Sequence, residues 1–148
     1  MKFTIVLFAA WAALGQLAGT PDEDLARVQS EHNLEKRAHL ALDNAEEALN
    51  QARQDYAKGA EAAANSRLEE MRRSVEMADS ALKQTGKNPS RSPKHFKTAE
   101  LRTRDLLRKL DGFREQMSVA DQKIADDAMS AIQGIHDAWL EGIMGKRK

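Results

Sequence analysis

The sequence predicts an all-α protein: an antiparallel helical bundle, or two packed helical hairpins. Small and apolar residues recur at steps of three and four through most of residues 38–143, a spacing that keeps them on one stripe of a helix. Glycine or proline punctuates this pattern near positions 21, 59, 86 and 93, where helices are expected to begin or end. No stretch has the strict alternation of a half-buried strand. We therefore expect four helices in a single domain, residues 20–148, after a short N-terminal segment.

The first predicted helix spans residues 21–57. Thr20 can cap it, Pro21 suits its first position, and Glu23 can complete a capping box. Its first turns carry few large apolar residues, so we expect them to overhang the bundle. The core stripe starts later, and its alanines let a neighbouring helix approach closely: Ala38, Leu42, Ala45, Leu49, Ala52 and Tyr56.

The second predicted helix spans residues 60–84, between Gly59 and Gly86, which are both suited to helix ends. Turn-forming residues make 85–92 a loop, after which Ser92 is expected to cap a third helix, 93–116, that starts at Pro93. The second stripe comprises Ala64, Leu68, Met71, Val75, Ala78 and Leu82, and the third comprises Phe96, Ala99, Thr103, Leu106, Leu110, Phe113 and Met117, widened by Leu107.

The fourth predicted helix spans residues 119–144. Ser118 is its expected cap, Asp121 its capping-box carboxylate and Gly145 its terminator. Alanine-lined stripes suit a self-associating hairpin as well as a monomeric four-helix bundle, so self-association stays open. The apolar side is expected to contain Ile124, Ala128, Ile132 or Ala131, Ile135, Trp139 and Ile143.

Residues 1–19 have the features of a secretory signal peptide. Lys2 supplies the positive charge, residues 3–14 are almost all apolar, and Ala13-Leu14-Gly15 fits a small-x-small cleavage pattern. The apolar run is shorter than the roughly 20 residues that span a bilayer, so we expect no transmembrane span in the mature chain. Retention of the segment as an amphiphilic anchor is the alternative. Export without any cysteine fits a bacterial periplasmic or secreted protein.

The composition excludes several classes of function. The chain has no cysteine, and 23 basic residues balance 23 acidic ones. Without a thiolate it has no disulfide scaffold, thiol catalysis, cysteine-ligated zinc or iron–sulfur cluster. A nucleic-acid partner is not expected, because nucleic-acid binders normally carry a basic excess. No cofactor motif was found either, so no cofactor is expected.

The zero net charge hides a segregated pattern. Residues 83–109 hold nine basic and two acidic side chains, whereas residues 20–57 hold four and nine. A basic helix beside acidic ones could simply favour one arrangement of neighbours. Alternatively, the amino end of the third helix binds an anionic partner, either an envelope protein or an anionic ligand. The candidate residues for such a site are Lys87, Arg91, Ser92, Lys94, His95 and Lys97, with Ser90 as a further hydroxyl donor.

Two segments carry a resemblance to known sequences. Residues 85–97 read TGKNPSRSPKHFK, and residues 142–146 read GIMGK. Both resemble segments of an uncharacterised family of small exported bacterial all-helical proteins. The resemblance implies a helical fold and a location in the envelope, and it implies no activity or site residues.

Histidines offer the remaining chemistry. His32, Glu35 and His39 are expected to share a helix face and could contribute to a metal site, although a solvated polar face is the favoured interpretation. His136 and Asp137 could supply a base, but no nucleophile is assigned, so a structural histidine is favoured. We therefore expect a non-enzymatic exported helical bundle that acts by protein–protein contact in the envelope. A small-anion or metal-binding bundle is the alternative.

Overall fold

In a computed structural model of the chain, residues 19–145 are described, and within them the predicted all-α fold is confirmed. Between residues 19 and 145 there are five helices rather than the four expected. The expected signal peptide lies outside the described residues except for Gly19. In residues 19–145 no helix combines the length and the apolar character that crossing a membrane requires. The helices are α1 (Pro21–Gln29), α2 (Leu34–Ala57), α3 (Glu61–Gln84), α4 (Lys94–Gln116) and α5 (Gln122–Met144).

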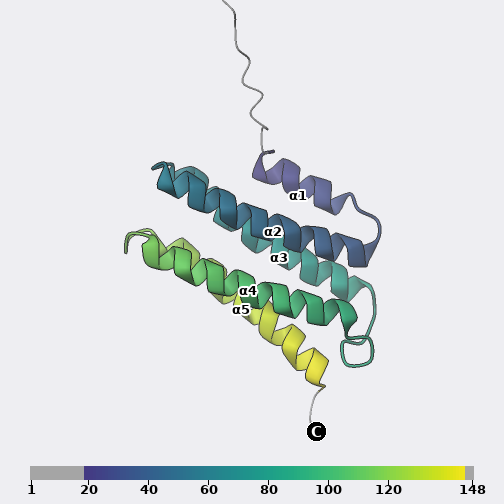
Figure 1. The fold of residues 1–148 in the computed structure, drawn as a ribbon. Helices are drawn as coiled ribbons and strands as arrows, with labels where there is room; N and C mark the ends of the chain where they lie inside the picture. The colour runs from purple at the N-terminus through teal and green to yellow at the C-terminus, as the bar shows by residue number, and fades with distance from the viewer. Residues whose placement is uncertain (1–18, 146–148) are drawn as a thin grey trace, which may run out of the picture.

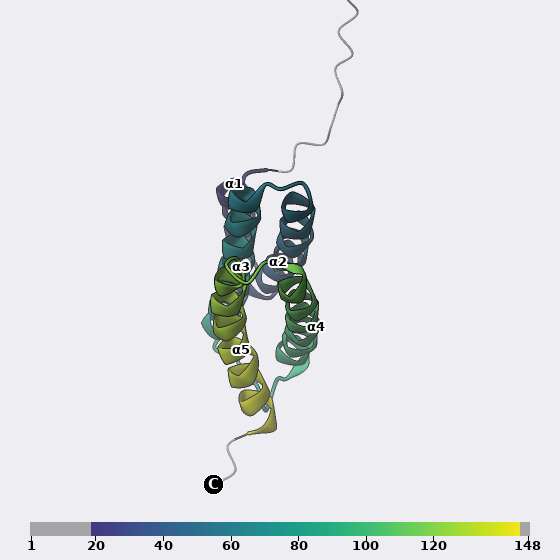
Figure 2. The ribbon, with the colours of Figure 1, turned by 90° about the vertical axis from the view of Figure 1, so that its left-hand side faces the viewer.

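The helices lie in three layers (Figure 1). The hairpin of α2 and α3 forms the middle layer, α1 packs on one side of it, and the hairpin of α4 and α5 packs on the other. Helix α4 contacts α2, and α5 contacts α3 (Figure 2). The most extensive contact joins α2 to α3, where alanines line the interface. Two packed helical hairpins are thus present, with α1 as an added layer.

The prediction of one continuous helix over residues 21–57 is wrong. Helix α1 does begin with the predicted capping box of Thr20 and Glu23. It stops at Gln29, and α2 starts anew because the Asn33 side chain accepts a hydrogen bond from the Lys36 N–H, 2.9 Å away, which is a strong N-cap. The first turns do not overhang the bundle. Leu25 and Val28 are each only 4% exposed, because α1 folds back onto α2 and α3.

A buried polar network ties these three helices together. The residue Glu70 of α3 is 2% exposed. Arg67 Nη1 donates to Glu70 Oε2 over 2.7 Å and to Asp24 of α1 over 3.3 Å, while the Asn44 amide of α2 donates to Glu70 Oε1 over 3.0 Å. Arg67 also reaches the Gly19 carbonyl at 2.8 Å. Every polar group here is satisfied, as a buried carboxylate requires.

The predicted core stripes of α2, α3 and α4 are buried, apart from Tyr56 and Leu107, which are partly buried. Gly59 and Gly86 follow their helices with φ of 78° and 68°, the left-handed region that glycine adopts without strain. The buried stripe of α5 is turned relative to the prediction, because His136 takes a core position and the isoleucines predicted beside Ile132 sit at its edges. It consists of Ala125, Ala128, Ile132, His136 and Trp139.

Two helix starts differ from the prediction. Ser92 does not cap α4; the N-cap position is Pro93, and no side chain caps that end. Helix α5 begins three residues later than expected, because Ser118 and Asp121 form a turn in which the Ser118 hydroxyl donates to the Asp121 carboxylate over 2.6 Å. The Tyr56 hydroxyl donates to Asp121 and accepts from the Ser118 N–H, which fixes this turn to α2.

Candidate functional site

The predicted anion-site residues all lie in the α3–α4 loop or the first turns of α4. Asn88 organises this loop: its side-chain oxygen accepts from the Ser90 N–H at 2.9 Å and from the Ser90 hydroxyl at 2.7 Å. Its carbonyl accepts from the Ser92 N–H at 2.8 Å. The Ser90 hydroxyl is thus used inside the loop. Pro89 rests against α5, where a Cβ on Gly142 would lie 3.1 Å from the proline ring.

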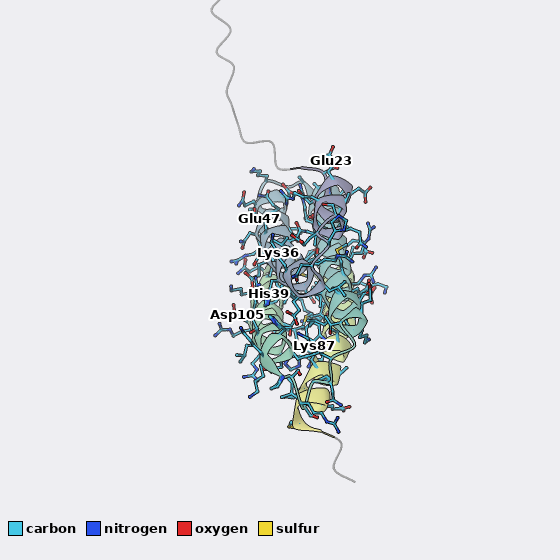
Figure 3. The ribbon with its side chains drawn as sticks, turned by 90° about the vertical axis from the view of Figure 1, so that its right-hand side faces the viewer. Glu23, Lys36, His39, Glu47, Lys87 and Asp105 are labelled. Atoms are coloured by element: carbon cyan, nitrogen blue, oxygen red, sulfur yellow. The ribbon has the colours of Figure 1, made fainter. Side chains whose placement is uncertain are left out.

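Two of the six candidate residues contact α2. Lys87 forms an ion pair with Glu35, and His95 Nε2 lies 3.1 Å from the other oxygen of the same carboxylate. The hydrogen bond from Lys87 is the main reason why the pKa of Glu35 is lowered from its ordinary value. Figure 3 views the end of the bundle where the α3–α4 loop lies, with Lys87 and His39 labelled. Lys87 and His95 therefore anchor the loop to α2.

His95 also meets His39 of α2. His39 Nε2 lies 2.9 Å from His95 Nδ1, and the rings pack edge to face with centroids 5.1 Å apart. The pKa of His39 is lowered by burial first and then by the positive charges of His95 and Arg102. Sequence reasoning missed this contact because it joins residues 56 positions apart, and no local pattern reports such a pair.

The expected grouping of His32 with Glu35 and His39 on one helix face is wrong. Helix α2 begins at Leu34, so His32 lies in the preceding loop and is exposed. Across residues 19–145, no group of three or more histidine, aspartate or glutamate side chains is arranged to hold a metal ion. His95 replaces His32 as the neighbour of His39, and it does so as a hydrogen-bonding partner.

The other candidate residues face solvent. Arg91, Ser92, Lys94 and Lys97 are exposed, and within the described part of the chain none of the three cations forms an ion pair. We call these four residues the cationic loop surface. Because the loop is held by Asn88, by Lys87 and His95 on α2, and by Pro89 on α5, their backbone positions are fixed.

Other basic residues of α4 are paired within the chain. Arg102 donates to Asp43 over 2.6 Å and to Glu46 over 3.0 Å, both on α2. Arg114 pairs with Asp126 of α5. These contacts favour the intramolecular interpretation of the charge pattern for the middle and end of α4. The cationic loop surface is different, because its cations have no ion-pair partner in the described part of the chain.

His136, the candidate base, occupies a structural position. It is 8% exposed, its Nε2 lies 2.9 Å from Glu100 Oε1, and its Nδ1 lies 3.1 Å from Asp137 Oδ1. The hydrogen bond with His136 is the main reason why the pKa of Asp137 is lowered. The Thr103 hydroxyl, three residues after Glu100 on α4, donates to the backbone carbonyls of Ala99 and Glu100. Both ring nitrogens are thus engaged, and the neighbouring hydroxyl serves the helix.

Comparison with models of known protein families, with curated proteins and with solved structures finds no match to this chain. The resemblance of residues 85–97 and 142–146 to exported helical proteins stays an expectation, and the function has to be inferred from the geometry of the chain's own side chains.

Proposed function

We propose that this protein is exported from a bacterial cytoplasm and acts without catalysis, by binding an acidic partner protein of the cell envelope through the cationic loop surface. One observation carries the proposal: Arg91, Lys94 and Lys97 are exposed and unpaired among residues 19–145, on a loop that is fastened to two helices. The export part rests on the features of residues 1–19.

A fixed loop with free cations suits recognition of a charged protein surface. Complementary charge steers encounter and fixes orientation, and unpaired side chains need not break an internal ion pair to bind. Immobilising a mobile loop would cost binding free energy. Here the Asn88 hydrogen bonds and the Lys87–Glu35 ion pair already hold the backbone, so that cost is reduced.

Contact rather than catalysis is favoured by the way the chemistry-bearing side chains are used. His136 is held between Glu100 and Asp137, and His39 and His95 hold α2 to α4. A catalytic acid or base needs a positioned group that can reach a substrate. Both ring nitrogens of His95 and of His136, and Nε2 of His39, instead contact neighbours in the fold.

The direct test is a binding experiment with two matched variants. The first, Arg91→Glu with Lys94→Glu, reverses charge on the cationic loop surface. The second, Arg53→Glu with Lys58→Glu, makes the same change in net charge on exposed positions at the carboxyl end of α2. Both are first shown to fold by circular dichroism. Each protein is then used to capture partners from envelope extract at low and at high salt.

The proposal expects an acidic protein to be captured by the wild type and the α2 variant, to be lost with the loop variant, and to be released by salt. Equal capture by all three proteins, or no capture by any, contradicts it. The alternative ligand-binding role is tested by melting the protein with phosphate or zinc ions, since a ligand of the native state raises Tm.

A further inference from the structure

The outward face of α4 carries an exposed leucine among basic residues. Leu101, Arg104 and Arg108 follow one another at steps of three and four, so they share one stripe of the helix. Leu101 is 55% exposed, and the side chains of Arg104 and Arg108 are 61% and 79% exposed. Leu101 is thus a large apolar side chain on a charged surface, and it is not buried in the protein's own core.

The outward face of α5 is acidic and has small residues at its centre. Asp127, Gly134 and Asp137 are exposed and share one stripe with Ser130, while Ala138 is exposed beside it. The Asp127 and Asp137 side chains are 65% and 57% exposed. Ser130, Gly134 and Ala138 thus form a strip of small exposed residues flanked by carboxylates.

Both stripes lie on the side of the α4–α5 layer that faces away from α2 and α3. On α4, Arg102 marks the side facing α2, and Glu100 and Arg114 mark the side facing α5. Leu101 and Arg108 lie on the remaining side. On α5, Trp139 marks the side facing α3 through its hydrogen bond to Asp79, and Gly134 lies away from it.

Two glycines in these helices are required neither by their backbone φ angles nor by close packing within the described part of the chain. Gly112 and Gly134 lie in helix interiors, are exposed, and do not have positive φ. A Cβ at either position would meet nothing within 4 Å. A glycine in a helix interior costs about 1 kcal/mol relative to alanine. In return it lets another helix approach closely, and among residues 19–145 no other helix does so at either position.

The two faces also match in level along the helices. Helices α4 and α5 are antiparallel, and Glu100 contacts His136 while Arg114 contacts Asp126. Moving forward along α4 therefore corresponds to moving backward along α5, and these two contacts show which residues lie at the same level along the bundle. Leu101 is therefore level with the small residues Gly134 and Ala138, and Arg108 is close in level to Asp127. Two copies related by a two-fold axis parallel to the helices have each residue at the same level along that axis. In this arrangement α4 of one copy packs against α5 of the other.

We propose that the outer face of the α4–α5 layer binds a second copy of this chain, with Leu101 of each copy against Gly134 and Ala138 of the other and Arg108 beside Asp127. The present partners of these charges lie on the same helices: Asp105 is partly exposed and Lys123 is exposed. Such surface pairs contribute little, so exchanging them costs little free energy. The dimer uses the middle of α4, does not include the cationic loop surface, and does not depend on the proposed function.

Sedimentation velocity of the full protein as recovered from expression, at concentrations up to about 1 mM, measures this association. Gly134→Gln places a longer side chain, of a type that helices favour, where Leu101 of the second copy would pack. We expect it to abolish the dimer while raising Tm by about 3 °C, which separates loss of the interface from loss of the fold. Ala63→Gln, which adds to the exposed surface of α3, is the control and should stay dimeric.

Charge reversal tests the arrangement. Arg108→Glu and Asp127→Lys should each be monomeric alone, because each homodimer would contain two like-charge contacts, and an equimolar mixture should dimerise again because both contacts become attractive. The proposal is supported if the dimer forms in the mixture but not in either variant by itself. A wild type that stays monomeric overturns it, as does a dimer insensitive to Gly134→Gln or a mixture that fails to recover.

Discussion

His39 on α2 and His95 on α4 face each other with Nε2 and Nδ1 2.9 Å apart. A neutral imidazole has one donor and one acceptor nitrogen, whereas an imidazolium has only donors. The contact therefore persists only while at least one of the two rings is neutral. Glu35 and Lys87 flank His95, and the Arg102 guanidinium donates to the His39 carbonyl over 3.3 Å, so the pair lies where loop, α2 and α4 meet.

This contact predicts a stability that falls in mild acid. The pKa of His39 is lowered in the fold from 6.5, so the unfolded chain takes up its proton at a higher pH. Stability from His39 is therefore complete above about pH 6.5 and decreases as the pH falls below it. Glu35, whose pKa is lowered from 4.5, adds a loss that begins only near and below that value.

Urea unfolding at about pH 7.5 and pH 5.5, followed by Trp139 fluorescence, measures the effect. His39→Gln keeps a side chain that can donate to His95, and we expect it to shrink the drop in unfolding free energy between the two pH values. His32→Gln, at the exposed loop position, is the control and should leave the drop as in the wild type. An equal drop in all three proteins would show that the histidine pair is not responsible.

A second prediction concerns the buried carboxylate of Glu70. Arg67→Met removes its ionic partner, and the side chain of Glu70 is only 1% exposed, so the uncompensated charge should lower the unfolding free energy by about 3 kcal/mol. Adding Glu70→Leu should restore most of this loss, because the charge is then gone as well. A single variant that costs less than about 1 kcal/mol would contradict the importance of this network.

A third prediction contrasts two glycines. Gly86 has φ of 68°, so Gly86→Ala should lower the unfolding free energy by about 1 kcal/mol. Gly112 lies in the interior of α4 with open space around it, so Gly112→Ala should raise the unfolding free energy by roughly 0.5–1 kcal/mol. Thermal melts of both variants beside the wild type test this, and the two shifts in Tm should have opposite signs.

Processing of the N-terminal segment gives a fourth prediction. Expressed in a bacterium with its own N-terminus, the protein should leave the cytoplasm and lose mass corresponding to cleavage between residues 15 and 19. Intact-mass spectrometry of the exported fraction measures the site. If Gly19 is retained, its carbonyl can keep the hydrogen bond from Arg67. An intact chain in the membrane fraction would instead favour the anchor interpretation.

The periodic parts of the fold could be predicted from the sequence because burial repeats locally. The stripe from Ala64 to Leu82 is buried throughout, as steps of three and four on one helix require. The break after Gln29 was missed because Asn33 in a polar stretch is a cap only if its side chain turns to the Lys36 N–H. The composition of this polar stretch does not reveal whether the Asn33 side chain caps a helix.

The candidate site was predictable only in part, for the same physical reason. The concentration of cations near Arg91 is visible in the sequence, since charge can be counted along the chain. Which cations remain free depends on contacts between distant residues. Glu35 pairs with Lys87 and His95, so neither is among the unpaired cations, and nothing in the spacing within α2 indicates this pairing.

The central claim is that the cationic loop surface contacts an acidic envelope protein, and photo-crosslinking in the cell tests it most directly. A photoreactive residue at Ser92 leaves every cation in place, and one at Ala57, exposed at the opposite end of the bundle, is the control. We expect an acidic envelope protein to be crosslinked from position 92 only, and to be lost when Arg91→Glu and Lys94→Glu are added. No adduct from position 92, or the same adduct from both positions, would contradict the account.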